Sequence, residues 1–151
     1  HGHHRRQRQM CIRDRMSAYE IVNKIIPEIE SKSADFICLN FANPDMVGHT
    51  GNFNAAVKAC ETVDECMGKV VDKCIENDYS LIIIADHGNS DVMINNDGSA
   101  NTAHTTNPVP IIIVDKEIEK VDDGILADIA PTILNILNID KPKLMTGKIL
   151  I

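Results

Sequence analysis

Three short apolar segments, each bordered by a polar loop, constrain the fold of this chain more than any other feature. They are residues 34–43 (ADFICLNFAN), 80–85 (SLIIIA) and 109–115 (VPIIIVD). Short runs of this kind are typical of strands that are covered on both faces, as in parallel sheets. We therefore expect a mainly parallel sheet in which these three segments are buried strands.

The segments between the expected strands carry helical patterns. Residues 16–32 begin with Ser17 three positions before Glu20, the spacing of a capping box, and Pro27 should kink or shorten that helix. Apolar residues recur on one face over 54–77 and again over 126–138. Helices alternating with buried strands predict an α/β fold of three layers, with helices on both faces of the sheet.

Two connections in this pattern do not resemble helices or strands. Residues 43–52 (NPDMVGHTGN) contain so much Pro, Gly and Asn that we expect a loop. Residues 86–107 are polar, rich in Gly and Asn, and long for a plain connection. Loops of that length are more often functional than idle, so this segment is a candidate for a site.

The first 15 residues (HGHHRRQRQMCIRDR) differ in composition from the rest of the chain. They hold all five arginines and three of the six histidines. A basic arm for nucleic acid or a membrane patch would have this composition, but we interpret residues 1–15 as a non-native, disordered cloning or sequence-assembly scar. Residues 16–151, with ten lysines against 21 acids, form the expected folded part and should not favour nucleic acid or anionic lipid.

Composition also bears on the cellular location. No run approaches the ~18 apolar residues of a membrane span, and the first residues lack the apolar centre of a secretory signal. The five cysteines are odd in number and lack paired metal-ligand spacing, so we expect them to be reduced. These features predict a cytoplasmic protein without membrane association.

Possible metal ligands gather in the polar loops. Asp45 and His49 follow the first expected strand, Asp86 and His87 follow the second, and His104 precedes the third. Each alone could be a turn, capping or hydrogen-bonding residue. Sites in open parallel sheets form at the carboxyl ends of strands, where these loops should meet. Jointly, two carboxylates and three imidazoles suit Mn²⁺, Zn²⁺ or Mg²⁺, and five ligands suit a pair of ions of the kind used in phosphoryl transfer.

Longer motifs in these same regions carry a family resemblance. The segments NFANPDMVGHTGNFNAAVKACETVDECMGKVV, IIIADHGNSD, TAHTTNPVPIIIV and GILADIAPTIL, with MTGK after them, resemble the C-terminal part of the cofactor-independent (2,3-bisphosphoglycerate-independent) phosphoglycerate mutases. That family belongs to the alkaline phosphatase superfamily. The resemblance extends over about residues 16–151 and implies an incomplete alkaline-phosphatase-like fold, in which this segment is the C-terminal part of the metal-binding phosphatase-like domain.

The resemblance implies roles for the candidate ligands. Asp45, His49 and His104 would hold one Mn²⁺, and Asp86 and His87 would hold part of a second, with Zn²⁺, Mg²⁺ or Co²⁺ as other possible ions. The complete enzyme would interconvert 3-phosphoglycerate and 2-phosphoglycerate in glycolysis through a phosphoserine, as a monomer. No serine of this chain occupies the family's nucleophile motif, so we assign no catalytic residue here.

Other functions remain open at this point. A phosphopentomutase or a metal-dependent phosphatase of the same superfamily would share the ligand pattern, and a metal-binding module without chemistry of its own would lack a nucleophile too. Residues 16–151 contain no arginine, the side chain best suited to grip a carboxylate and a phosphate. We therefore expect the chain to be inactive alone, and marginally stable because strand edges would be uncovered.

Overall fold

The computed structural model describes residues 17–151, which form two compact units. Of the described residues, the first unit contains 17–77 together with His87–Pro108, and the second contains Asp78–Asp86 and Val109–Ile151. The scar predicted for residues 1–15 lies outside the described residues. The chain thus passes from the first unit to the second, back to the first, and again to the second.

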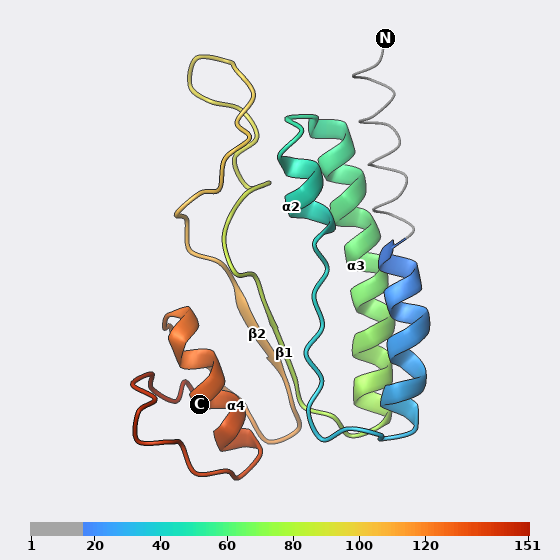
Figure 1. Ribbon diagram of the computed structural model, residues 1–151, viewed down its shortest axis with the longest axis vertical. Coiled ribbons are helices and arrows are strands. Elements are labelled where there is room, and N and C mark those ends of the chain that lie inside the picture. The colour runs from blue at the N-terminus through green and yellow to red at the C-terminus, as the bar shows by residue number, and fades with distance from the viewer. Residues whose placement is uncertain (1–16) are drawn as a thin grey trace. The chain divides into compact units, whose positions relative to one another are not determined.

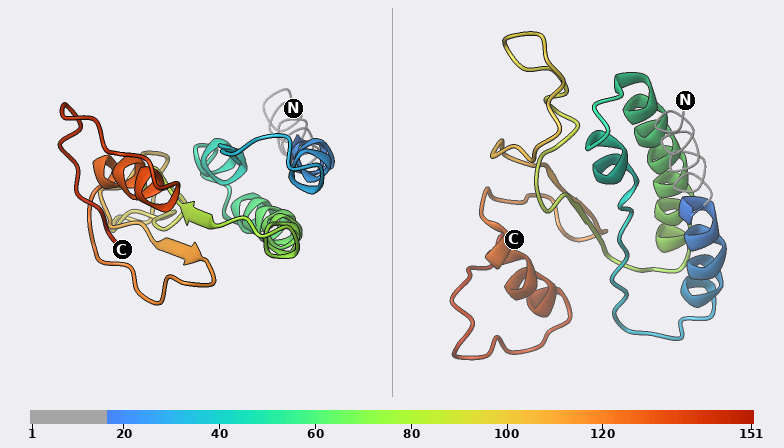
Figure 2. Two further views of the ribbon diagram at one scale, coloured as in Figure 1. Left: turned by 90° about the horizontal axis from the view of Figure 1, so that it is seen from below. Right: turned by 45° about the horizontal axis from the view of Figure 1, so that its top comes forward.

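Two long helices make up much of the first unit. Residues 17–30 are helical, three residues beyond Pro27, and α3 covers Phe53–Glu76. The Asn52 side chain caps α3 by accepting a hydrogen bond from the Ala55 amide at 3.0 Å, one of the contacts that satisfies the unpaired amides of a helix start. The two helices lie side by side (Figures 1 and 2), and Tyr19 donates to Glu65 across them at 2.7 Å. Both predicted helices are confirmed.

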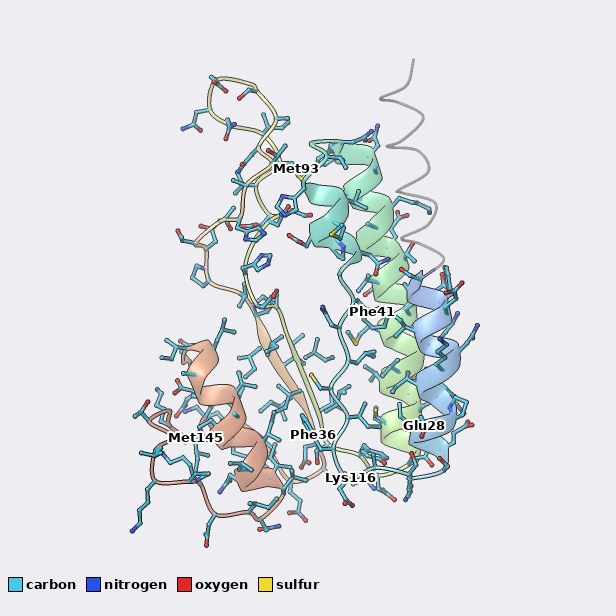
Figure 3. All side chains as sticks on the ribbon, in the orientation of Figure 1. Glu28, Phe36, Phe41, Met93, Lys116 and Met145 are labelled. Atoms are coloured by element: carbon cyan, nitrogen blue, oxygen red, sulfur yellow. The ribbon has the colours of Figure 1, made fainter. Side chains whose placement is uncertain are left out.

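The prediction of a loop over 43–52 is wrong in its first half, because α2 covers Asn43–Gly48. Proline is tolerated at the first helical positions, where its missing amide has no partner to lose, and Pro44 stands there. A small apolar cluster fixes α2 to α3 and to the long polar loop; its members are Val47, Ala56, Ala59 and Met93. Met93, labelled in Figure 3, thereby anchors the 87–108 loop to the helices of the first unit.

The strand predicted over residues 34–43 is not formed. The strands among residues 17–151 are β1 (Leu81–Ile84) and β2 (Ile111–Val114) alone, and 36–42 has no regular structure. Phe36 and Cys38 are exposed, whereas Ile37 and Leu39 are partly covered, so the alternation of an extended chain persists. A strand requires a hydrogen-bonded neighbour, and an apolar pattern alone cannot supply one.

The second unit is built on β1 (Leu81–Ile84) and β2 (Ile111–Val114). Both strands lie where the sequence predicts them, which confirms the α/β class. They pair antiparallel, with Leu81 opposite Val114 and Ile84 opposite Ile111, so the expectation of parallel pairing is wrong for these two. Parallel neighbours need a crossover, usually a helix, and the segment between β1 and β2 contains none.

The final helix of the second unit matches its prediction. A turn of 3-10 helix, η1 (Leu126–Asp128), leads into α4 (Ile129–Ile136). The C-terminal residues return to this helix, since the Leu150 amide donates to the Thr132 hydroxyl at 3.1 Å and Thr132 donates to the Asp128 carbonyl at 2.7 Å. Thr132 and Leu150 are both buried. The end of the chain is therefore held by a buried hydroxyl.

Large apolar side chains also lie at the surface. Exposed members include Phe36, Phe53, Ile112, Ile125 and Leu144. Among residues 17–151, no helix has both the length and the apolar character required to cross a membrane.

Candidate metal centre

Two of the predicted ligands are held by the short helix α2. Asp45 is its third residue and His49 is its C-cap, so the two are four positions apart and face the same side. The His49 Nε2 lies 3.1 Å from the Asp45 Oδ1. The correction from loop to helix matters here, because one helical turn brings these two donors together.

His104 completes a triangle with them. Its Nε2 lies 3.2 Å from the Asp45 Oδ1 and 3.2 Å from the His49 Nε2, although 55 residues separate the two histidines. Ligand atoms about 2.1 Å from one ion and about 100° apart lie roughly 3.2 Å from each other. The three atoms thus have the mutual spacing of ligands that share one ion.

The lone pairs of these atoms also favour a shared ion. The His49 Nδ1 lies 2.7 Å from the Thr102 carbonyl oxygen, an acceptor, which assigns the proton of the neutral ring to Nδ1 and leaves a lone pair on Nε2. The Asp45 carboxylate also offers only lone pairs. A divalent cation can bind all three atoms of the triangle through such lone pairs.

His87 joins this group from the start of the 87–108 loop. Its ring stacks on that of His104, with centroids 3.6 Å apart and planes 19° apart. The His87 Nε2 lies 4.0 Å from the Asp45 Oδ1. Asp45, His87 and His104 each offer a ligand atom, and these atoms lie within 4.8 Å of one another, close enough for a metal site.

Asp86 is the fifth residue of the predicted set. It is exposed and ends the 78–86 segment of the second unit, one residue before His87. The other four, Asp45, His49, His87 and His104, lie together in the first unit, and "the four-residue cluster" refers to them below.

Asn89 is a site residue that sequence reasoning missed. It is 7% exposed, and its Nδ2 donates to the Asp45 Oδ1 at 2.9 Å. Ser90 donates to the Pro44 carbonyl oxygen at 3.1 Å, so two successive residues of the loop bind α2. A Cβ on Gly48 would collide with the Asn89 side chain, which explains the glycine there. The signal available was the NS pair of the DHGNSD motif, but its role depends on docking against α2.

Known proteins share the sequence that builds this geometry. The sequence pattern of the Metalloenzyme superfamily matches residues 8–141. Over 131 residues the chain is 60% identical to the 2,3-bisphosphoglycerate-independent phosphoglycerate mutase of Flavobacterium johnsoniae, a match that covers 87% of this chain and 26% of that protein. The protein of the same name from Clostridium acetobutylicum is 51% identical over 140 residues, or 91% of this chain and 28% of that one.

A solved structure agrees with the sequence matches. The phosphoglycerate mutase of Leishmania mexicana, crystallised at low cobalt concentration, superposes with a TM-score of 0.82 at 28% identity, over 95% of this chain and 30% of that one. This likeness supports an incomplete alkaline-phosphatase-like α/β fold. The chain spans about a quarter of the length of the curated relatives that it matches. The resemblance drawn from the motifs is confirmed, and the chain belongs to the Metalloenzyme superfamily.

Proposed function

We propose that this chain is the metal-binding part of a phosphoglycerate mutase that interconverts 3-phosphoglycerate and 2-phosphoglycerate through a phosphoserine. The relatives that bear this name support the reaction, since they are 51–61% identical to the chain. The single observation that carries the metal-binding part is the triangle of Asp45, His49 and His104 ligand atoms, with sides of 3.1, 3.2 and 3.2 Å.

In this proposal Asp45, His49 and His104 hold one divalent ion, and Asp86 and His87 contribute to a second. Mn²⁺ is the proposed ion, with Co²⁺, Zn²⁺ and Mg²⁺ as alternatives, because carboxylate and imidazole ligands can bind all of these ions. Bound ions would neutralise charge on the phosphoryl oxygens and lower the pKa of an attacking hydroxyl. The chain's own contribution is to orient the donors.

Two contacts perform that orientation. The Thr102 carbonyl oxygen lies 2.7 Å from the His49 Nδ1 and so directs the Nε2 lone pair at the triangle. Asn89, in the 87–108 loop, donates a hydrogen bond to the Oδ1 of the Asp45 carboxylate. Residues that fix metal ligands in this way typically change metal affinity by about 10–100-fold when they are replaced.

Titration calorimetry with Mn²⁺ tests the metal site. We expect His49→Ala and His104→Ala each to weaken binding at least tenfold, because each removes one donor of the triangle. A variant without residues 1–15 is the necessary background, since His1, His3 and His4 could bind metal independently. Asp64→Ala, an exposed acid on α3, serves as the matched control and should bind as the parent does. Equal affinities in all these variants would remove the assignment.

A second experiment tests the reaction. The chain would be mixed with the remaining part of a longer relative, and conversion of 3-phosphoglycerate to 2-phosphoglycerate would be followed with Mn²⁺ present. We expect no conversion by the chain alone and conversion by the mixture. A mixture that only hydrolyses phosphate esters would instead favour a metal-dependent phosphatase, and transfer on a pentose phosphate would favour a phosphopentomutase.

The remaining expectations concern the setting of the complete protein. We propose that it acts in glycolysis in the cytoplasm, as a monomer that binds phosphoglycerate and neither nucleic acid nor membrane. The excess of acids over lysines in residues 16–151 supports the exclusion of polyanions. Light scattering of the complete protein, which should give the mass of one chain, tests the monomer.

A further inference from the structure

Three polar side chains outside the four-residue cluster join the two ends of the 87–108 loop. The Asp91 carboxylate accepts hydrogen bonds from the Thr105 hydroxyl, at 2.9 Å to Oδ2 and 3.1 Å to Oδ1. It also accepts one from the Asn107 Nδ2 at 2.7 Å. One carboxylate near the beginning of the loop therefore receives two donors from its end. We call Asp91, Thr105 and Asn107 the loop brace.

The loop brace lies directly beside two of the histidines. Gly88 follows His87 and Thr105 follows His104, and the Thr105 amide donates to the Gly88 carbonyl oxygen at 2.8 Å. A Cβ on Gly88 would collide with both the Thr105 hydroxyl and the Asp91 carboxylate. The brace is thus packed against the backbone at the isolated bridge that joins the two ends of the loop.

The bridge between Gly88 and Thr105 is antiparallel, so His87 and His104 are diagonal neighbours across it. Aromatic side chains can reach each other over that diagonal, and the ring centroids of His87 and His104 lie 3.6 Å apart. A single backbone hydrogen bond in a polar, partly exposed loop is weak by itself. Two further donors, the Thr105 hydroxyl and the Asn107 side-chain amide, bind an ionised acceptor and reinforce it, and charge-assisted bonds are the stronger kind. The hydrogen bond from Asn107 lowers the pKa of Asp91, in keeping with an ionised acceptor.

We propose that Asp91 is a positioning residue that holds His104 against His87 through Thr105 and Asn107. None of Asp91, Thr105 and Asn107 belongs to the predicted ligands. The functional meaning of this inference therefore rests on the proposed metal site. As a consequence, the loop brace raises the metal affinity of the four-residue cluster, because it holds the His87 and His104 rings in place before an ion binds. A preorganised site loses less free energy in ordering its ligands.

The test compares Asp91→Ala with the parent chain without residues 1–15. In the metal-free protein with ¹³C-labelled histidine, nuclear Overhauser effects between the His87 and His104 ring protons report the stacking directly. We expect them to be strong in the parent and absent or greatly reduced in Asp91→Ala. With Co²⁺, we expect about tenfold weaker binding and a changed visible absorption spectrum, because outer residues of metal sites typically contribute 10–100-fold.

Asp97→Ala is the matched control. Asp97 lies in the same loop, is exposed, and accepts hydrogen bonds from its neighbour Ser99, at 2.6 Å from the hydroxyl and 2.9 Å from the amide. Its removal should leave the ring stacking and the Co²⁺ affinity at the parent values. Asp91→Asn alone should reduce both the ring stacking and the Co²⁺ affinity. The double variant Asp91→Asn, Asn107→Asp exchanges the acceptor and the donor, and it should restore most of both.

The outcomes separate this inference from the proposed function. Unchanged ring stacking in Asp91→Ala would overturn the positioning role, whatever the protein does with metals. Conversely, unstacked rings in Asp91→Ala with no Co²⁺ binding by any variant would support the positioning role and reject the metal site. Unstacked rings in Asp97→Ala as well would show a general loosening of the loop, and they would also overturn a specific role for Asp91.

Discussion

The two units each contain a carboxylate surrounded by hydrogen-bonding groups, and the two environments differ in kind. Asp128 in the second unit is 3% exposed and accepts backbone amide hydrogens from Ile125 at 2.9 Å and from Lys148 at 2.8 Å. Asp45 in the first unit has a side chain that is 32% exposed, and its Oδ1 faces imidazole nitrogens at 3.1 and 3.2 Å.

The difference separates a structural acid from a proposed metal ligand. Backbone amides can act only as hydrogen-bond donors, and the lowered pKa of Asp128 has those two hydrogen bonds as its main causes. Imidazole nitrogens can serve either as donors or as metal ligands, so the Asp45 environment changes with what binds. Asp128 is more buried than Asp45, and burial alone would therefore favour Asp128 as a site residue. Because its partners are backbone amides, we interpret its role as structural.

Replacing the two acids should give the largest contrast. We expect Asp45→Ala to reduce divalent metal affinity by roughly 100-fold or more, because it removes the only carboxylate ligand of the triangle. Asp128→Asn should leave that affinity within about twofold, and it should lower the melting temperature instead, since two backbone amides lose an ionised acceptor. Calorimetric titration and thermal unfolding measure the two effects. A decrease of metal affinity in Asp128→Asn of similar size would abolish the distinction.

A smaller effect is expected for the residue that orients Asp45. Asn89→Ala removes the 2.9 Å hydrogen bond to the Asp45 Oδ1 while keeping every proposed ligand, so metal affinity should fall by about 10–100-fold. Asn95→Ala, which removes hydrogen bonds near the loop tip to Ser99 and Ala100, is the control and should bind normally. Equal affinities of Asn89→Ala and the parent would show that the Asp45 carboxylate needs no such support.

Acid should weaken the second unit through Asp128. Its pKa is lower in the folded chain than in the unfolded one, so its contribution to stability is complete above the unfolded value of about 3.9 and is lost as the pH falls through the folded value. Metal-free protein should therefore melt at lower temperature as the pH falls below about 4. The slope of that decline should be smaller in Asp128→Asn, and identical slopes would contradict the assignment.

The smallest effect is expected where a carboxylate is fully at the surface. Glu65 on α3 accepts hydrogen bonds from Lys69 at 2.8 Å and from Tyr19 at 2.7 Å, but water competes for all these groups. Lys69→Ala should change neither the melting temperature, beyond about one or two degrees, nor the metal affinity. A large drop would mean that the packing of the first helix on α3 depends on this pair.

Local patterns explain what could be predicted of the fold. The helix expected over 54–77 is α3, Phe53–Glu76, because its apolar face repeats along a single continuous segment. Pairing is not local: neither the antiparallel register of β1 and β2 nor the absence of a strand over 34–43 follows from apolar runs. Composition alone misses helix α2, because it weighs Pro, Gly and Asn without regard to position, whereas Pro44 stands at the one place in a helix that suits it.

The sequence predicts that five ligands, Asp45, His49, Asp86, His87 and His104, meet because their loops share one edge of a parallel sheet. That reason does not hold for β1 and β2, which pair antiparallel. In the first unit the members of the four-residue cluster meet because α2 spaces Asp45 and His49 by one turn, and because the Gly88 and Thr105 backbones pair. The residue types favour metal binding, which remains a proposal. The supporting roles of Asn89 and Asp91 could not be predicted, because their hydrogen-bond partners are brought to them only by folding.

The interleaving of the two units has a consequence for dividing the polypeptide. A cut after Asn77, where the first unit is interrupted, would leave Asp45 and His49 on one piece and His87 and His104 on the other. Such a cut would separate the three atoms of the triangle, so a shortened polypeptide that keeps the proposed centre intact must reach at least from α2 to His104 and include β1.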